Sequence, residues 1–265
     1  MFDPSKPLHQ SLEDQCVATR AIADDIYRDY LSEIERFLDA QFELLDLTFW
    51  TTHSDEFSGR GPAQTILYSA LHKNAFLFFA SVDLTRRGLY GPACTLLRPV
   101  LEALAIAKYC ALSNDTTVFE TWRSGEYVSL TNQVLNRIGR PGIGEFRRLW
   151  KGLNNMAHAS IYSQQISSDF GSIKKELHNT LVIIRMLLVF NYHLLTRHFL
   201  TPTTLYYTGS YGDKAKLDSA RQRAREMAGK FRKSFAKDGR QFLRECCASW
   251  QLKAVKKPRQ CSGRG

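Results

Sequence analysis

The sequence has few of the residues that would mark a metal-binding, disulfide-rich or fibrous protein. Its six cysteines stand at positions 16, 94, 110, 246, 247 and 261, with no CxxC pair among them, so a zinc ribbon and a thioredoxin-type site are excluded. Sixteen glycines and eight prolines in 265 residues are too few for a collagen-like or linker-like chain. We expect Cys94 and Cys110 to be small core residues.

Motifs of the common catalytic folds are missing as well. The chain has no GxxxxGK[ST] loop, no HExxH pair and no GxSxG elbow, so we expect no metal and no other cofactor. The N-terminus lacks the basic-then-apolar layout of a signal peptide. The one dense apolar run, 181–190, contains Arg185 and is shorter than the about 20 residues of a membrane span. We therefore expect a cytoplasmic protein with no transmembrane segment.

Apolar residues recur at helical spacing almost everywhere, and strand-like alternation occurs nowhere. We therefore predict an all-α fold, an antiparallel (up-and-down) helical bundle with a basic C-terminal helical extension. The first helix is expected to break near Asp39 and the third to kink at Pro99, while 201–212 is expected to be a turn. The expected helices are residues 11–50, 63–87, 92–113, 117–138, 145–158, 171–199 and 214–250.

The net charge of +10 is distributed unevenly. Residues 213–265 hold 16 Lys and Arg against 5 Asp and Glu, whereas residues 11–50 hold ten acidic residues and three Arg. We therefore divide the chain into a bundle domain, 1–212, and a basic amphipathic helix with a disordered tail, 213–265. This extension either packs on the acidic first helix, binds the phosphate backbone of RNA, or attaches to an anionic membrane surface.

Arg98 and Glu102 form the first candidate site. They lie four residues apart on a strongly apolar helix, so they share a face that we expect to be largely buried. One interpretation is a structural salt bridge to a neighbouring helix. The other is an interhelical pocket, in which the arginine would bind an anion such as phosphate.

The second candidate site is the segment LNNMAHAS. Asn154 and His158 lie one helical turn apart, so the asparagine could set the tautomer of a histidine suited to acid–base chemistry. Arg148 and Lys151 stand upstream and could contact phosphate. The alternative is a histidine that caps the C-terminus of the helix.

The stretches RRGLYGPACTLLRPVLEALAIAKY and LNNMAHAS resemble uncharacterised bacterial helical proteins related to the HEPN (higher eukaryotes and prokaryotes nucleotide-binding) superfamily. The resemblance covers about residues 60–200. It implies a helical bundle, often a homodimer, and in active members a metal-independent ribonuclease site built from an Arg and a His with four to six residues between them. Related proteins act in toxin–antitoxin pairs and phage defence.

The residues at the family's spacing before His158 are Leu153, Gly152 and Lys151, and lysine lacks the planar fork that arginine offers to phosphate. The resemblance suggests that Arg98 and Glu102 take over this site. We thus predict a HEPN-like protein that binds nucleotide or RNA, a divergent ribonuclease with His158, Arg98 and Glu102 as catalytic residues and Asn154, Lys151 and Arg148 as substrate-binding residues. RNA would also contact the basic extension. The rival prediction is a non-enzymatic helical dimer that acts as a protein-interaction module.

Overall fold

The structure, a computed structural model, describes residues 5–49, 62–113, 115–138, 143–157 and 173–248. These residues are overwhelmingly helical and contain no strand, which confirms the predicted all-α bundle. Its helices are α1 (Leu8–Ile26), α2 (Arg28–Leu47), α4 (Pro62–Arg86), α5 (Tyr90–Ser113), α6 (Thr117–Arg123), α7 (Gly144–Ala157), α9 (Ile173–Leu194), α10 (Pro202–Tyr211), α11 (Lys214–Ser234) and α12 (Lys237–Ala248), with single turns η2 (Leu130–Val134), η3 (Leu135–Arg137) and η5 (Leu195–Phe199).

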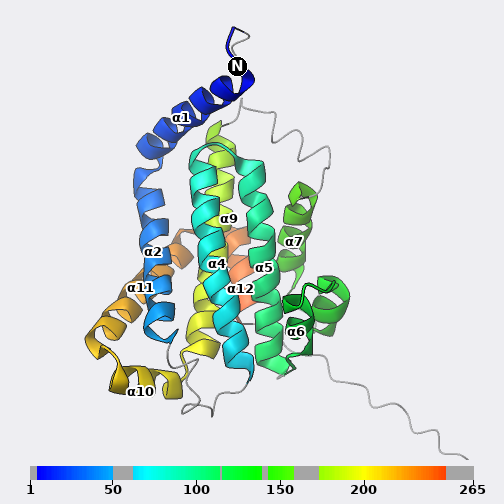
Figure 1. Cartoon of the computed structure of the whole chain (residues 1–265), viewed down its shortest axis with the longest axis vertical. Coiled ribbons are helices and arrows are strands. Elements are labelled where there is room, and N and C mark those ends of the chain that lie inside the picture. The colour runs from blue at the N-terminus through cyan, green and yellow to red at the C-terminus, as the bar shows by residue number, and fades with distance from the viewer. Residues whose placement is uncertain (1–4, 50–61, 114, 139–142, 158–172, 249–265) are drawn as a thin grey trace, which may run out of the picture.

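Helices α4, α5 and α9 form the centre of the bundle (Figure 1). The chain reverses between α4 and α5 at Gly88, whose φ of +79° favours glycine. A Cβ atom at this position would also lie 2.9 Å from the Thr19 side chain, so the glycine allows α1 to approach the turn. Helix α2 packs against α4 and α9 on one side, and α7 packs against α5 on the other.

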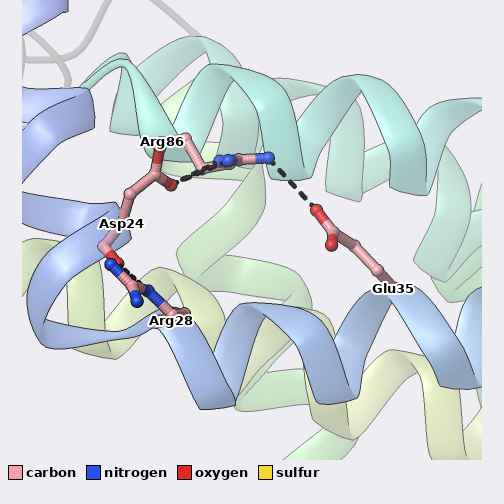
Figure 2. A network of polar contacts seen from close by, with 4 residues as sticks. All are labelled: Asp24, Arg28, Glu35 and Arg86. Atoms are coloured by element: carbon pink, nitrogen blue, oxygen red, sulfur yellow. Dashed lines mark hydrogen bonds and ion pairs between the residues drawn. The ribbon is translucent and has the colours of Figure 1, made fainter.

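The predicted first helix is wrong in one respect, because it breaks at Tyr27 and not near Asp39. Arg86 of α4 holds the two halves together, as Figure 2 shows: its guanidinium lies 2.7 Å from the Asp24 carboxylate of α1 and 3.1 Å from that of Glu35 in α2. Arg28, the first residue of α2, donates from Nε to the Asp24 carbonyl oxygen. The break is therefore stabilised by contacts with a helix distant in sequence.

Three other predicted boundaries need correction. The helix expected over 117–138 stops after Arg123, because Gly125 adopts a φ of +84° that ends the helical path. The turn expected over 201–212 is helix α10, which begins with a proline and is capped by the Thr201 hydroxyl, an acceptor for the Thr204 amide. The helix expected over 214–250 divides at Phe235, whose ψ of 141° is extended.

Helix α9 is largely buried among the other helices of the bundle. Its segment Lys175–Phe199 is long and apolar enough to cross a membrane, with a mean hydropathy of 1.3 over 18 residues, but here α2, α4, α5, α11 and α12 all contact it. A buried chain of side-chain amides sets its register: Asn191 Nδ2 donates to Gln41 Oε1 at 2.9 Å, and Asn74 Nδ2 donates to Asn191 Oδ1 at 3.2 Å. These bonds join α2, α9 and α4. Since buried amides need hydrogen-bond partners, they favour the one alignment of the three helices in which the amides meet.

Helices α11 and α12 of the basic extension share this core. Helix α11 lies along α2 and α9, and α12 lies against α7 and α9. The apolar stripe of the extension is covered, with Leu217 2%, Phe231 0% and Phe235 5% exposed. The Arg223 and Lys230 side chains form ion pairs with carboxylates of α2. Of the three arrangements weighed for the extension, the structure has the one in which its first helix packs on the acidic helix.

Candidate functional site

Arg98 and Glu102 of α5 form an ion pair at the boundary between α5 and α7. Arg98 Nη2 lies 3.3 Å from Glu102 Oε1, and the two side chains are 32% and 21% exposed. The Arg98 guanidinium also lies over the Trp150 ring of α7, 5.4 Å from its centroid, within the range of a cation–π contact. The pair is thus neither fully buried nor freely solvated.

Burial affects both members of this pair, the pKa of Glu102 and the hydrogen bonding of Arg98. Burial raises the pKa of Glu102, although Arg98 and Lys73 of α4 both act to lower it. Arg98 Nε is buried and has no hydrogen-bond partner among the described residues. Since a guanidinium has five N–H donors, the bond from Nη2 to Glu102 does not use all of them. Lys73 itself lies 4.7 Å from the Trp122 ring centroid.

The predicted site residues Arg148, Lys151 and Asn154 lie on helix α7, and Arg148 is on a different side of this helix from the Arg98–Glu102 pair. Arg148 pairs with Glu145 at 2.8 Å and lines a cavity on the α9 side. Trp150, two residues further on, faces Arg98. Two residues correspond to about 200° around a helix, so Trp150 and Arg148 lie on nearly opposite sides of α7. The structure therefore does not bring Arg148 to the Arg98–Glu102 pair. Lys151 is exposed and Asn154 is half-buried on the same helix.

His158 lies outside the described residues. The site as described therefore consists of the Arg98–Glu102 pair, Trp150 and, through its charge, Lys73. Sequence reasoning identified the pair because both residues lie on one helix. It missed Trp150 and Lys73, which reach the pair from two other helices, and no spacing in the sequence could have indicated this.

A second feature is a groove of about 1030 Å³ along α11, called here the basic groove. One wall is formed by the side of α11 that lies beside the bundle. Its lining residues recur along the helix from Asp218 to Lys233, so the groove extends over most of α11. Tyr192 of α9 and Thr196 of η5 stand opposite. The groove is lined by Leu44, Tyr192, Thr196, Asp218, Arg221, Gln222, Arg225, Glu226, Gly229, Lys230 and Lys233.

Two cations of the basic groove have no ion-pair partner among the described residues. Arg221 pairs with Asp218 at 3.5 Å, whereas Arg225 and Lys233 are exposed and form no ion pair within the described part of the chain. Burial raises the pKa of Tyr192, and the nearby Arg232, Arg225 and Arg221 oppose this shift. The groove lining thus holds four cations against the two carboxylates of Asp218 and Glu226, next to an aromatic ring.

The buried cysteines have the surroundings of core residues, not of reactive thiols. Cys94 and Cys110 are buried, as expected for small core residues, and burial raises the pKa of both thiols to about 12. Over the ranges given above, no three His, Cys, Asp or Glu side chains gather as they would around a metal ion.

Comparisons with family models, curated proteins and solved structures gave no significant match to this chain. The relationship to HEPN proteins therefore stays a prediction from short motifs. The geometry defines an all-α bundle that has a half-buried Arg–Glu pair on one side and the basic groove on another.

Replacing Arg98 by Ala is expected to lower the free energy of unfolding by about 2 kcal/mol at pH 8, because Glu102 would be left half-buried without its cation. The loss should shrink as the pH falls, since a carboxyl with a raised pKa takes up a proton more readily in the folded state than in the unfolded state. Urea denaturation at pH 8 and pH 5 measures both effects.

The double variant Arg98→Ala/Glu102→Gln is the control, because it removes the stranded charge and should recover stability at pH 8. A loss for Arg98→Ala that is negligible and independent of pH would show that water already solvates the pair.

Proposed function

We propose that this protein binds RNA through its phosphate backbone, in the basic groove between α11 and the bundle. The observation that carries the proposal is the unpaired charge of Arg225 and Lys233 on the wall of a long groove. Cations that track a backbone next to an aromatic ring are typical of single-strand binding sites. Such binding would be independent of sequence and sensitive to salt.

The groove gains this charge from the way α11 packs. The apolar stripe of α11 turns toward α2 and α9, and Arg223 and Lys230 are engaged by carboxylates of α2. Arg225 and Lys233 form no ion pair among the described residues, although the carboxylates of Asp218 and Glu226 line the same groove. Packing against the acidic helix therefore leaves part of the basic helix available to an anion, so the two roles weighed for the extension are compatible.

Reversing two charges in the groove is expected to weaken RNA binding. Arg225→Glu/Lys233→Glu should lower the affinity for a labelled 12-nucleotide single-stranded RNA by about tenfold or more, measured by fluorescence anisotropy. The slope of log K against log salt should fall in magnitude by about 1.4, since each lost phosphate contact with a single strand contributes about 0.7.

The matched control is Arg123→Glu/Lys175→Glu. These residues are exposed, form no ion pair in the described ranges and do not line the groove, so this variant changes the net charge equally. Equal loss of affinity in both variants would show that only net charge matters, and no binding by the natural chain would show that the proposal is wrong.

Cleavage of RNA is the second part of the proposal, with the Arg98–Glu102 pair as the anion-binding part of the centre and His158, which directly follows α7 in the sequence, as its acid or base. A defence or toxin role would follow from such an activity. His158→Ala should abolish cleavage of an RNA substrate and leave the far-UV spectrum and the RNA affinity unchanged. Undiminished cleavage by this variant would remove His158 from the centre.

One observation favours the alternative of a protein-interaction module. Phe76 and Phe79 of α4 are 58% and 43% exposed, and Phe76 lies in edge-on contact with Phe42 of α2. Exposed apolar clusters often mark protein contacts. If the protein is a homodimer through this face, Phe76→Glu/Phe79→Glu should be monomeric in sedimentation experiments under conditions in which the natural chain is dimeric. An unchanged sedimentation coefficient would exclude this face.

A further inference from the structure

A second cavity, separate from the basic groove, lies between α7, α9 and the turn from α11 to α12. Its volume is about 610 Å³, which is within the range of small-molecule sites. Leu149 and Met156 of α7, Val182 and Met186 of α9, and Phe242 of α12 give it a mainly apolar wall. Arg185 of α9 and Arg148 of α7 also line it. We call it the α7–α9 cavity.

Arg185 is an unusual wall residue because its charge is buried and poorly satisfied. The residue is 3% exposed. Its guanidinium carbon lies 4.0 Å from the centroid of the Tyr30 ring and 4.1 Å from that of the Phe231 ring. Its Nη2 donates to Ser234 Oγ at 2.8 Å, the one hydrogen bond of this guanidinium within the described part of the chain.

The acidic neighbour of Arg185 does not complete its bonding. Glu33 Oε2 is 4.0 Å away, beyond hydrogen-bond distance, and this carboxylate is also held by Lys230. Arg185 Nε is buried with no partner among the described residues. Since buried donors are normally bonded, Arg185 is a residue of the cavity lining whose Nε–H group lacks the expected acceptor among the described residues.

Gly152 provides an independent observation. It lies inside α7, lines the α7–α9 cavity, and a Cβ atom built on it would have no described atom within 4 Å. Glycine within a helix is less favourable than alanine, and neither a close approach nor a positive φ is recorded for Gly152. The fold therefore does not require glycine here, and the effect of the glycine is to keep the cavity open.

Arg148 adds charge at the solvent side of the same cavity. Its side chain is 71% exposed and pairs with Glu145, whose own side chain is 16% exposed. The cavity therefore combines an apolar wall with a buried cation whose hydrogen bonding is incomplete, and its one lining carboxylate is already engaged by Arg148. A carboxylate would accept from the donors of Arg185 and offset its charge, whereas an alcohol oxygen brings no charge and a quaternary ammonium ion has no acceptor.

We propose that the α7–α9 cavity binds a small amphipathic carboxylate, with the carboxylate bonded to Arg185 and an apolar body against the side chains of α7 and α9. Arginine suits this task because its planar donors match the two oxygens of a carboxylate. The proposal does not depend on RNA binding, which concerns a groove lined by other residues.

Decanoate, kept below its micelle concentration, is the probe, and isothermal titration calorimetry on the full chain is the measurement. The neutral 1-decanol and the cationic decyltrimethylammonium ion have the same apolar body. Decanoate should bind, and both analogues should bind about tenfold or more weakly, because hydrogen bonds to charged groups are among the strongest that proteins form.

Two variants test the location. Gly152→Leu should abolish decanoate binding by filling the cavity while it preserves or raises the melting temperature, since leucine favours a helix over glycine. Arg185→Met retains the apolar length of the side chain and leaves Glu33 with Lys230, and it should reduce the affinity about tenfold or more. If Arg185→Met does not fold, Gly152→Leu and the two analogues still decide the matter.

The matched control is Gly229→Leu. Gly229 is also inside a helix with no described atom within 4 Å of an added Cβ atom, but it lines the basic groove. Gly229→Leu should bind decanoate like the natural chain and bind RNA less well, and Gly152→Leu should show the reverse. Absence of decanoate binding, equal binding of decanol, or full binding by Gly152→Leu would each overturn the proposal.

Discussion

Between pH 6.5 and pH 4.5 the protein is expected to lose about 2 kcal/mol of folding stability through His193 alone. Burial, helped by the charges of Lys108, His198, Arg232 and Arg197, lowers the pKa of His193 from 6.5 to about 3. His193 therefore takes up a proton near pH 6.5 in the unfolded chain, but only near pH 3 in the folded chain. Stability is fully present above pH 6.5 and is lost as the pH falls toward the folded pKa.

His198 should add to the same loss. Burial, with Lys108 and Arg197, lowers its pKa to about 4, and its ring centroid is 6.1 Å from that of His193. The two losses should not add fully, because neighbouring histidines titrate together. His193 lies at the end of α9, next in sequence to the groove-lining Tyr192, and His198 lies in η5.

Urea denaturation at pH 7 and pH 4.5 measures this effect. His193→Gln, which cannot be protonated, should lose about 2 kcal/mol less than the natural chain over this interval. His178→Gln is the matched control, because it makes the same substitution at an exposed position of the same helix and leaves both buried histidines in place. Equal losses for the natural chain and His193→Gln would show that the folded protein accommodates a charge at this position.

The fold class was predictable because each helix has an apolar face of helical period, and such a face must be buried. The interruptions were less predictable. Tyr27 ends a helix in a sequence whose periodicity continues, and Arg86, a distant residue, holds both sides of the break. Phe235 divides the basic extension so that Phe242 can reach the core. Both breaks depend on tertiary contacts that local propensity does not contain.

The candidate site was predictable to the same extent. Arg98 and Glu102 share a helical face, so their pairing follows from spacing alone. The charge of Arg185 could be read in the sequence, but its surroundings could not, because Tyr30 and Phe231 come from opposite ends of the chain. The basic groove likewise needs Tyr192 beside α11, which only the packing of the bundle establishes.

Replacing Phe231 by Ala is expected to lower the free energy of unfolding by about 3–5 kcal/mol, the usual range for a large aromatic side chain removed from a core. Phe231 is fully buried, packs edge-on against Phe37 with ring centroids 5.1 Å apart, and covers Arg185. The substitution would leave a cavity and uncover a buried charge at the same point. Urea denaturation monitored by far-UV circular dichroism measures the loss.

The control is Arg223→Ala, which removes the ion pair between the same helix and Glu43 of α2. Both side chains are more than a third exposed, so the loss should be below about 1 kcal/mol. Raising the salt concentration to 1 M should change the stability of the natural chain little for the same reason. A large loss for Arg223→Ala together with a small one for Phe231→Ala would mean that charge, and not the apolar stripe, holds α11 on the acidic helix. In that case salt would lower the RNA affinity of the basic groove in two ways. It would detach α11 from α2, and it would screen the contacts between the groove and the RNA phosphates.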